Sequence, residues 1–261
     1  MNVTLLAHTQ LADQFYDSFD IHGELGEYEG NSLDRMNVND GQAVALTAIR
    51  TCYSANKPSE IVALEGEKYF GKAAADGEGG SDADRLFRHI TRSGHTSTLE
   101  HITYTFAVEG VSRSLLAQLT RHRQLSFSVQ SQRYVRFGSG DKSGGMDYVT
   151  PPSIEGKFTD SNGGLTGEEV FEGFMTTAQA YYDELRSMGV PPEDARFVLP
   201  NAASCNLVMT LNLRALLEFY GKRKKGKGAQ WEIADFAEQL RAAAIKVDPW
   251  VDQYFGGGAA A

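Results

Sequence analysis

The chain has 261 residues, of which 41% are hydrophobic and 23% charged, and its net charge is −9 at pH 7. This length suits one large domain or two small ones, and the composition is that of a soluble globular protein. The negative charge disfavours a duplex nucleic acid as partner, and no apolar run approaches the roughly 20 residues that a membrane span needs.

The first residues and the cysteines bear on the cellular compartment. The N-terminal segment lacks a basic start followed by an apolar core, so we expect no signal peptide and a cytoplasmic protein. Cys52 and Cys205 are far apart and form no CxxC pair, which argues against a disulfide framework or a zinc site. We expect two small buried apolar residues, with a catalytic thiol as the alternative.

The first half of the chain contains two predicted strands and two predicted helices. Residues 3–7 predict a strand, and residues 41–53 predict a helix with Val44 and Tyr53 among its inward positions. The glycine-rich, acidic residues 74–84 predict a solvated loop or insertion, followed by a helix that ends near Gly94. Residues 102–108 then alternate between apolar and polar side chains, which indicates a half-buried strand.

Beyond this strand the apolar residues are spaced four positions apart instead of two. Val111, Leu115 and Leu119 lie four residues apart, so a helix should lead from the strand towards Arg121. Residues 138–166 are rich in Gly, Ser and Pro and predict a long connection or lid.

The second half predicts three more helices and a strand. Ala178 and Tyr182 belong to a long helix, in which Phe174 and Tyr181 are also expected in the core. The strand covers residues 207–211, Asn212 should cap the next helix, and residues 233–244 form the last long helix. Residues 256–261 predict a disordered tail. The mixture predicts one α+β domain over residues 1–261, with a mostly antiparallel sheet flanked by long helices.

Residues 118–137, QLTRHRQLSFSVQSQRYVRF, carry the densest set of candidate functional side chains. Arginine forks bind phosphate bidentately, and Ser and Gln side chains suit the donors and acceptors of a pyrimidine ring. Taken alone, the segment is equally compatible with a solvated basic loop. No GxxxxGK[ST] or GxGxxG motif occurs, which excludes a phosphate loop or Rossmann fingerprint as the nucleotide site.

The same segment resembles the signature of the flavin-dependent thymidylate synthases: RHR, seven residues, Ser, then xRY. Here the signature runs from Arg121 to Tyr134. Further blocks resemble the family in order and spacing: GHTSTLEH, DARFVLP, NLRALLEFYGKR and AQWEI. The resemblance extends from about residue 40 to residue 250.

The resemblance implies an α+β protomer in a homotetramer, with active sites between subunits. It implies FAD as cofactor and dUMP as substrate, with NADPH and 5,10-methylenetetrahydrofolate as co-substrates and no covalent enzyme nucleophile. The implied FAD contacts are His95, Ser97, Arg121, His122, Arg123, Asn212 and Arg214. The implied dUMP contacts are Gln118, Arg121, Ser131, Gln132, Arg133, Arg196 and Arg223.

Arg223 is the implied catalytic residue, because a guanidinium would favour ionisation of the uracil at N3. Ser131 has no evident neighbouring base, so we assign it to binding rather than to nucleophilic attack. The chain departs from the family at Val129, which is usually polar, and at Glu218, where Asn or His is expected. In the basic loop of residues 222–228, Lys227 replaces a familiar histidine, and we interpret it as solvated.

Two alternatives remain open from the sequence. His89, His95, Glu100 and His101 cluster in sequence as in a metal hydrolase, but HExxH is absent and we expect no metal site. The basic clusters also fit a non-catalytic nucleotide- or RNA-binding module. The negative net charge of the chain and the lack of known RNA-binding motifs argue against this alternative.

Overall fold

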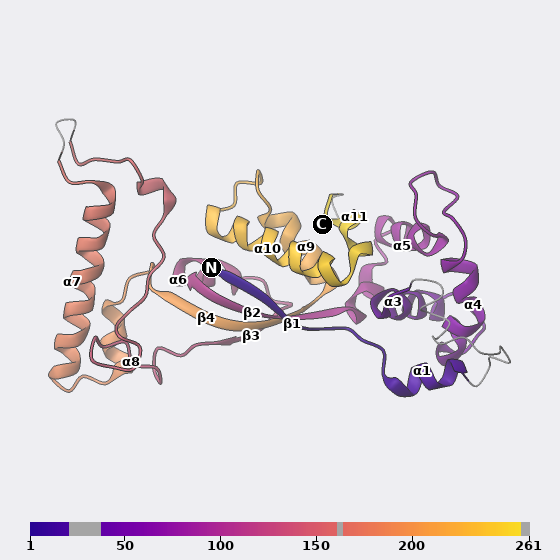
Figure 1. The fold of residues 1–261 in the computed structure, drawn as a ribbon, viewed down its shortest axis with the longest axis horizontal. Helices are drawn as coiled ribbons and strands as arrows, with labels where there is room; N and C mark the ends of the chain where they lie inside the picture. Colours follow the sequence, from indigo (N-terminus) through magenta and orange to yellow (C-terminus); the bar gives the residue numbers. More distant parts are fainter. Residues whose placement is uncertain (21–37, 161–163, 257–261) are drawn as a thin grey trace. The chain divides into compact units, whose positions relative to one another are not determined.

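The computed structural model describes residues 1–20, 38–160 and 164–256, and Figure 1 traces their helices and strands. The chain divides into two compact units. Unit 1 comprises Met1–Asn2, Ala107–Arg123 and Phe127–Met209, and unit 2 comprises Val3–Phe106, Gln124–Ser126 and Thr210–Ala261. The expectation of a single domain stays a prediction.

The strands form one antiparallel four-stranded sheet in the order β1-β2-β4-β3. Their bounds are Asn2–His8 for β1, Thr103–Ser112 for β2, Ser126–Val129 for β3 and Ser204–Asn212 for β4. Alternation in β2 buries Tyr104, Phe106 and Val108 completely, as the sequence predicts. The α+β class and the three predicted strands are therefore confirmed.

Helices make up most of unit 2. They are α1 (Asp13–Asp20), α3 (Asp40–Thr51), η1 (Pro58–Glu60), α4 (Ile61–Phe70), α5 (Asp82–Arg92), η2 (Thr96–His101), α9 (Leu213–Arg223), α10 (Trp231–Val247), η5 (Pro249–Val251) and α11 (Asp252–Gly256). Helices α9, α10 and α11 pack on one another, and the fully buried rings of Phe219 and Phe236 meet edge to face at 5.9 Å. This aromatic pair fixes α9, which carries several of the predicted site residues.

The inner face of α3 differs from the predicted one at Val44 and Tyr53. Ala45, Leu46 and Ile49 are fully buried, whereas Tyr53 is 60% exposed and Val44 only half-buried. The helix ends at Thr51, so its period no longer governs the residues that follow. For the same reason the expectation of a buried Cys52 is wrong, because this cysteine is exposed; Cys205 is buried as expected.

Asp248 organises the buried polar contacts of unit 2. Its carboxylate accepts hydrogen bonds from the Tyr104 hydroxyl at 2.8 Å, the Asn39 amide at 2.9 Å and the Trp250 indole at 3.0 Å. Burial and the neighbouring Asp248 charge raise the pKa of Tyr104 well above its usual value. Asn39 also caps α3, so one cluster joins the beginning of α3, strand β2 and the end of α10.

The loop at residues 74–84 is held by ion pairs rather than merely solvated. The buried Arg88 guanidinium donates to both carboxylate oxygens of Asp76 at 2.8–3.0 Å and to Gln253 of α11 at 2.8 Å. Arg92 pairs with Glu78 at 2.6 Å. The last residues of the predicted loop are helical, because Ser81 caps α5 and the helix begins at Asp82.

Unit 1 contains α6 (Arg113–Leu119), η3 (Pro152–Ile154), α7 (Gly167–Ser187), α8 (Pro192–Ala195) and η4 (Arg196–Val198). Helix α6 buries Leu115 and Leu119, as the spacing predicts. Helix α7 buries Tyr182, whose hydroxyl oxygen accepts a hydrogen bond from the Phe137 backbone N–H at 3.2 Å. This bond attaches the end of the signature segment to the long helix.

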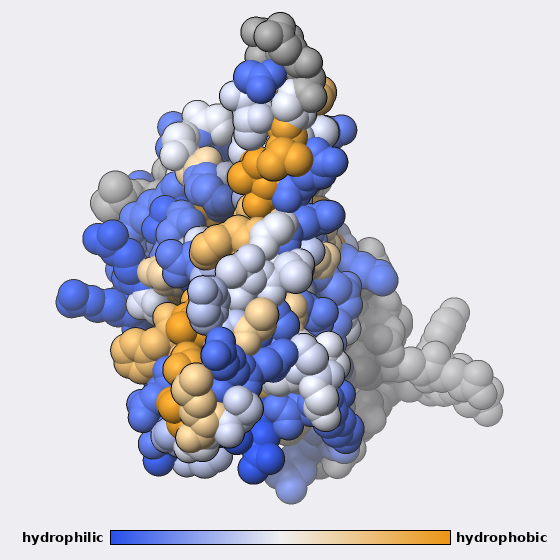
Figure 2. All heavy atoms as spheres, turned by 90° about the vertical axis from the view of Figure 1, so that its left-hand side faces the viewer, coloured by the Kyte–Doolittle hydropathy of each residue, from blue (hydrophilic) through white to orange (hydrophobic). Residues whose placement is uncertain are grey.

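The other face of α7 is apolar and exposed. Val170, Phe174, Tyr181 and Met188, which follows the helix, are 47% to 68% exposed. Their spacing places them within one narrow stripe along the helix axis. Figure 2 shows apolar residues gathered on the side of the molecule that carries α7. The expectation that Phe174 and Tyr181 lie in the core is therefore wrong for this protomer.

The long connection at residues 138–166 includes an isolated antiparallel bridge between Tyr148 and Ala203. Residues 161–163 and the expected tail beyond residue 256 lie outside the described residues. Among the helices described, none has the length and apolar character needed to cross a membrane.

Candidate functional site

The RHR triplet lies in a turn that follows α6. The Thr120 N–H and hydroxyl both donate to the Leu116 carbonyl at 3.0 Å, and the His122 N–H donates to the Leu119 carbonyl at 3.0 Å. These bonds close the helix and leave Arg121 and Arg123 exposed. Gln118, on the last turn of α6, donates to the Ser114 carbonyl at 3.3 Å. Local structure therefore presents both guanidinium groups to solvent, where an anion can reach them.

Ser131, Gln132 and Arg133 follow strand β3. The Gln130 N–H donates to the Asn206 carbonyl of β4 at 2.8 Å, which fixes the end of β3. The Ser131 hydroxyl oxygen then accepts the Arg133 N–H at 3.2 Å, closing a local turn. Gln132 is buried, at 7% exposure. The Ser131 hydroxyl thus shapes the turn that follows β3.

Glu193, which belongs to no predicted site, contacts both Arg133 and Arg196. The Arg133 Nε atom lies 2.5 Å from a carboxylate oxygen of Glu193. Arg196 Nε donates to the backbone carbonyl of the same glutamate at 3.0 Å. These two arginines are both predicted dUMP contacts, and 62 residues lie between them in the chain. Both contact one residue of α8.

Four of the predicted FAD contacts lie on two packed segments of unit 2. His95 and Ser97 are at the beginning of η2, and Asn212 and Arg214 are at the beginning of α9, which packs against η2. The Leu213 N–H donates to the Ile102 carbonyl at 2.7 Å and holds the two segments together. The other three predicted FAD contacts, Arg121, His122 and Arg123, belong to unit 1.

Asn212 and Arg214 already have partners in the protein. The Asn212 side-chain oxygen accepts the Ala215 N–H at 2.8 Å and caps α9, as predicted, which leaves its amide hydrogens for a ligand. Arg214 pairs with Glu100 at 2.6 Å and with Glu218 at 3.2 Å. These two carboxylates raise the pKa of Arg214, with Glu100 the stronger, and they compensate its positive charge.

His95 has a partner that sequence analysis placed incorrectly. The Tyr53 hydroxyl lies 2.9 Å from the Nδ1 atom of His95, and the two rings meet edge to face at 6.0 Å. Tyr53 was expected on the inner face of α3, and no local pattern distinguishes it from a core residue. Glu193, by contrast, has a signal in the sequence. It lies three residues before Arg196 and directly before the DARFVLP block.

Arg223 is the last residue of α9 and is half-buried. Beyond it, Lys225 pairs with Asp235 at 2.6 Å and Lys224 lies 5.7 Å from the Tyr220 ring centroid. Lys227 is exposed, in agreement with its interpretation as solvated.

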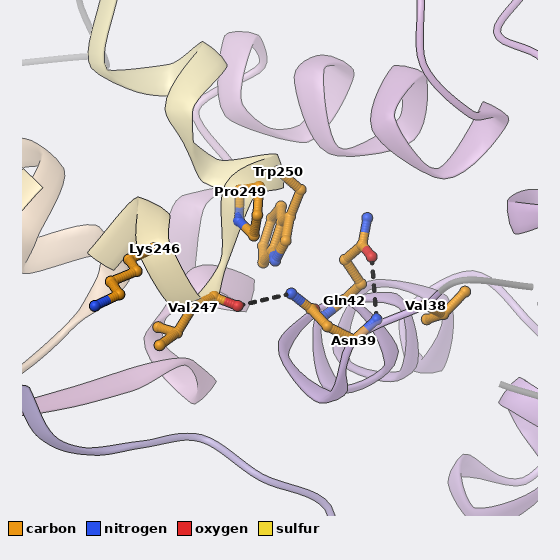
Figure 3. A pocket seen from close by; sticks show the side chains of 7 residues that line it. All are labelled: Val38, Asn39, Gln42, Lys246, Val247, Pro249 and Trp250. Atoms are coloured by element: carbon orange, nitrogen blue, oxygen red, sulfur yellow. Dashed lines mark hydrogen bonds between the residues drawn. The ribbon is translucent and has the colours of Figure 1, made fainter. Parts of the chain in front are cut away.

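The predicted residues do not line the pocket drawn in Figure 3. This pocket, of about 470 Å³, is lined by Val38, Asn39, Gln42, Lys246, Val247, Pro249 and Trp250. Asn39 donates to the Val247 carbonyl at 3.3 Å across its floor, beside the Asp248 cluster. The pocket therefore adjoins the Asp248 network and none of the predicted site residues.

The histidines of the metal-hydrolase alternative do not assemble a metal site. Within the described ranges, no group of three or more His, Cys, Asp or Glu side chains could hold a metal ion. Glu100 is occupied by Arg214, and His95 faces Tyr53. The alternative thus lacks geometric support.

Comparisons with known proteins identify the family of the chain. A family model described as thymidylate synthase complementing protein matches residues 33–250. A flavin-dependent thymidylate synthase of Halobacterium salinarum is 40% identical over 197 residues, covering 70% of this chain and 79% of the relative. Another, from Geobacter sulfurreducens, is 37% identical over 219 residues and covers 84% of both chains.

A solved structure is similar over nearly the whole chain. It is a UMP/dUMP methylase of Streptomyces cacaoi with bound 5-bromo-dUMP, 25% identical, with a TM-score of 0.63 and coverage of 99% of this chain and 95% of that one. Since the family model and the sequence relatives each cover most of the chain, it belongs to the flavin-dependent thymidylate synthase family.

Proposed function

We propose that this enzyme converts dUMP to dTMP by reductive methylation, with FAD as cofactor, 5,10-methylenetetrahydrofolate as one-carbon donor and NADPH as reductant. The observation that carries the proposal is the convergence of Arg133 and Arg196 on Glu193 in a member of this family. Two guanidinium groups that both contact one residue suit a phosphate monoester, because each can donate two parallel hydrogen bonds.

The dUMP contacts are assigned to Gln118, Arg121, Ser131, Gln132, Arg133, Arg196 and Arg223. Arg133 and Arg196 bind the phosphate, while Gln118, Ser131 and Gln132 offer hydroxyl and amide groups to the sugar and base. Arg121 lies at the border between the substrate and the cofactor. The similar Streptomyces cacaoi methylase, with its bound 5-bromo-dUMP, supports a uracil nucleotide as ligand of this fold.

The FAD site is assigned to His95, Ser97, Arg121, His122, Arg123, Asn212 and Arg214. The donor set of these residues fits the cofactor: arginines for the pyrophosphate, and hydroxyl, amide and imidazole groups for its polar edges. When bound, reduced FAD supplies a hydride and is reduced again by the nicotinamide. The protein binds and orients it, and no side chain needs to attack the substrate.

Arg223 is assigned to the chemistry at the uracil ring. A guanidinium keeps its charge at any physiological pH and stabilises an adjacent anion. Placed at N3 of uracil, it would favour the deprotonated ring, which is richer in electrons and easier to alkylate at C5.

A homotetramer with shared active sites, located in the cytoplasm, completes the proposal. The exposed apolar stripe on α7 supports oligomerisation, because a contiguous apolar surface of this kind commonly marks a protein interface. The oligomeric state is measured by analytical ultracentrifugation of the purified protein.

The test of the function is an anaerobic spectrum followed by a turnover assay. Bound FAD that bleaches with NADPH, together with dTMP formed from dUMP and methylenetetrahydrofolate, supports the proposal. Running UMP in parallel determines whether the ribose analogue is also methylated. A protein that binds neither FAD nor folate yet binds uracil nucleotides would instead be a non-catalytic nucleotide- or RNA-binding module.

A further inference from the structure

Glu193 makes an unusual pair of contacts for a residue beside a phosphate site. Its carboxylate binds Arg133 Nε at 2.5 Å, and its backbone carbonyl binds Arg196 Nε at 3.0 Å. The side chains of Arg133 and Glu193 are 57% and 43% exposed, so the pair lies at the surface and is accessible to a ligand.

The two contacts of Glu193 differ in what they mean for a ligand. The backbone contact positions Arg196 and leaves the guanidinium charge uncompensated. In the side-chain contact, the negatively charged carboxylate of Glu193 accepts from Arg133. A phosphate would offer the same kind of acceptor to an arginine side chain. Both oxyanions cannot accept from Arg133 Nε at the same time.

A dianionic phosphate at Arg133 would also be repelled by the glutamate if the carboxylate remained in place. The exposed pair is weak, however, so the carboxylate can leave at a small cost in free energy. Its departure needs only a change of side-chain rotamer, because the backbone of Glu193 is held separately by α8 and Arg196.

We propose that the Glu193 carboxylate is an internal substitute for the substrate phosphate: it occupies Arg133 in the ligand-free protein and is displaced when dUMP binds. This inference rests on the proposed function, since it takes Arg133 as a phosphate-binding residue. Glu193 then determines specificity. A simple anion such as inorganic phosphate must displace the carboxylate without help, whereas dUMP has additional contacts through its base and sugar.

The test compares dUMP affinity in the FAD-loaded protein and in Glu193→Gln, by isothermal titration calorimetry. Glutamine keeps the length and the backbone contact but removes the charge. We expect dUMP to bind about two- to fivefold more tightly to the variant, the range set by an exposed ion pair. Deoxyuridine, which lacks the phosphate, should bind equally to both proteins.

A matched control is Glu172→Gln on α7, which removes one exposed negative charge from the same unit. Its dUMP affinity should equal that of the wild type, so a gain in both variants would indicate a general charge effect and overturn the inference. An unchanged or weaker dUMP affinity in Glu193→Gln alone would also overturn it, while leaving the proposed function intact. If the wild type does not bind dUMP, that result contradicts both this inference and the proposed function.

Discussion

The Tyr53 hydroxyl lies 2.9 Å from Nδ1 of His95, and this contact joins the end of α3 to the beginning of η2. The donor and acceptor in this contact depend on the imidazole tautomer, and in either case the contact fixes the orientation of the ring. Because His95 is a proposed FAD contact, we expect Tyr53→Phe to lower kcat by up to about tenfold, the equivalent of one hydrogen bond.

The matched control for this variant is Tyr181→Phe, which removes an exposed hydroxyl from α7 in the other unit. Steady-state kinetics with dUMP and the rate of flavin reduction by NADPH measure the effect, and thermal unfolding measures stability. Unchanged kinetics in Tyr53→Phe would show that the contact does not position His95 for the reaction.

Arg223→Ala should largely abolish dTMP formation while FAD still binds and the fold is retained. We expect a loss of about 100- to 1,000-fold in kcat, as for other residues that stabilise developing charge. Lys222→Ala, one residue earlier on the same helix, is the control and should remain active. Normal turnover in Arg223→Ala would exclude the catalytic assignment.

Glu218→Gln should strengthen FAD binding. Arg214 is compensated by Glu100 and Glu218, and removing one of these carboxylates frees positive charge for the pyrophosphate. The expected gain is about two- to fivefold in the dissociation constant, measured by fluorescence titration of the apoprotein. Glu67→Gln, on the exposed side of α4, should leave FAD affinity unchanged. Weaker binding in Glu218→Gln would mean that the carboxylate positions Arg214 for the cofactor.

Arg88→Ala should destabilise unit 2 by about 1–3 kcal/mol, because the buried Arg88 side chain loses its hydrogen bonds to Asp76, Gln253 and the Gly79 carbonyl. The neighbouring Arg92→Ala removes a 63% exposed arginine and should reduce the free energy of unfolding much less. Urea unfolding monitored by circular dichroism measures the loss of stability in each of the two variants. Equal losses of unfolding free energy in the two variants would show that the contacts of Arg88 with the loop add little to stability.

The protein should lose stability in acid through a few identifiable carboxylates. Burial alone would raise the pKa of Glu65, but hydrogen bonds from Ser54, Arg50 and Asn56 outweigh burial and hold the pKa below its usual 4.5. Arg88 likewise outweighs burial at Asp76 and lowers its pKa below 3.8.

A carboxyl whose pKa is lower in the folded state stabilises the fold above its unfolded value. This contribution disappears as the pH falls from about 5 through the folded-state pKa. Urea midpoints between pH 7 and pH 3 should therefore decline, and less so in Glu65→Gln than in Glu172→Gln. An identical decline in both variants would contradict the assignment.

The regular elements were predictable because local apolar spacing determines them. Alternation in β2 and the four-residue spacing of α6 follow directly from which side chains the core must bury. The predicted face of α3 was wrong at Tyr53 because apolar character alone does not show where a helix ends. Phe174 and Tyr181 were misplaced because an apolar stripe reads the same whether it faces a core or another molecule.

The candidate site was predictable only where a motif marks it. The sequence identifies Arg133 and Arg196, but Glu193, which joins them, depends on a contact between segments far apart in the chain. The same holds for the ion pairs of Arg88 with the loop at residues 74–84. Charged partners leave no periodic pattern in a sequence, since either one alone looks like a solvated side chain.

The Asp248 cluster restricts how this protein can change in evolution. A Cβ atom at Gly41 would come within 2.5 Å of the Asp248 carboxylate oxygen, so the hydrogen-bonded acid and the glycine of α3 fill one space. Neither position can accept a larger side chain unless the other changes as well. Among descendants of this sequence, substitutions at residues 41 and 248 should therefore arise as a correlated pair, although the two residues are separated by almost the whole chain.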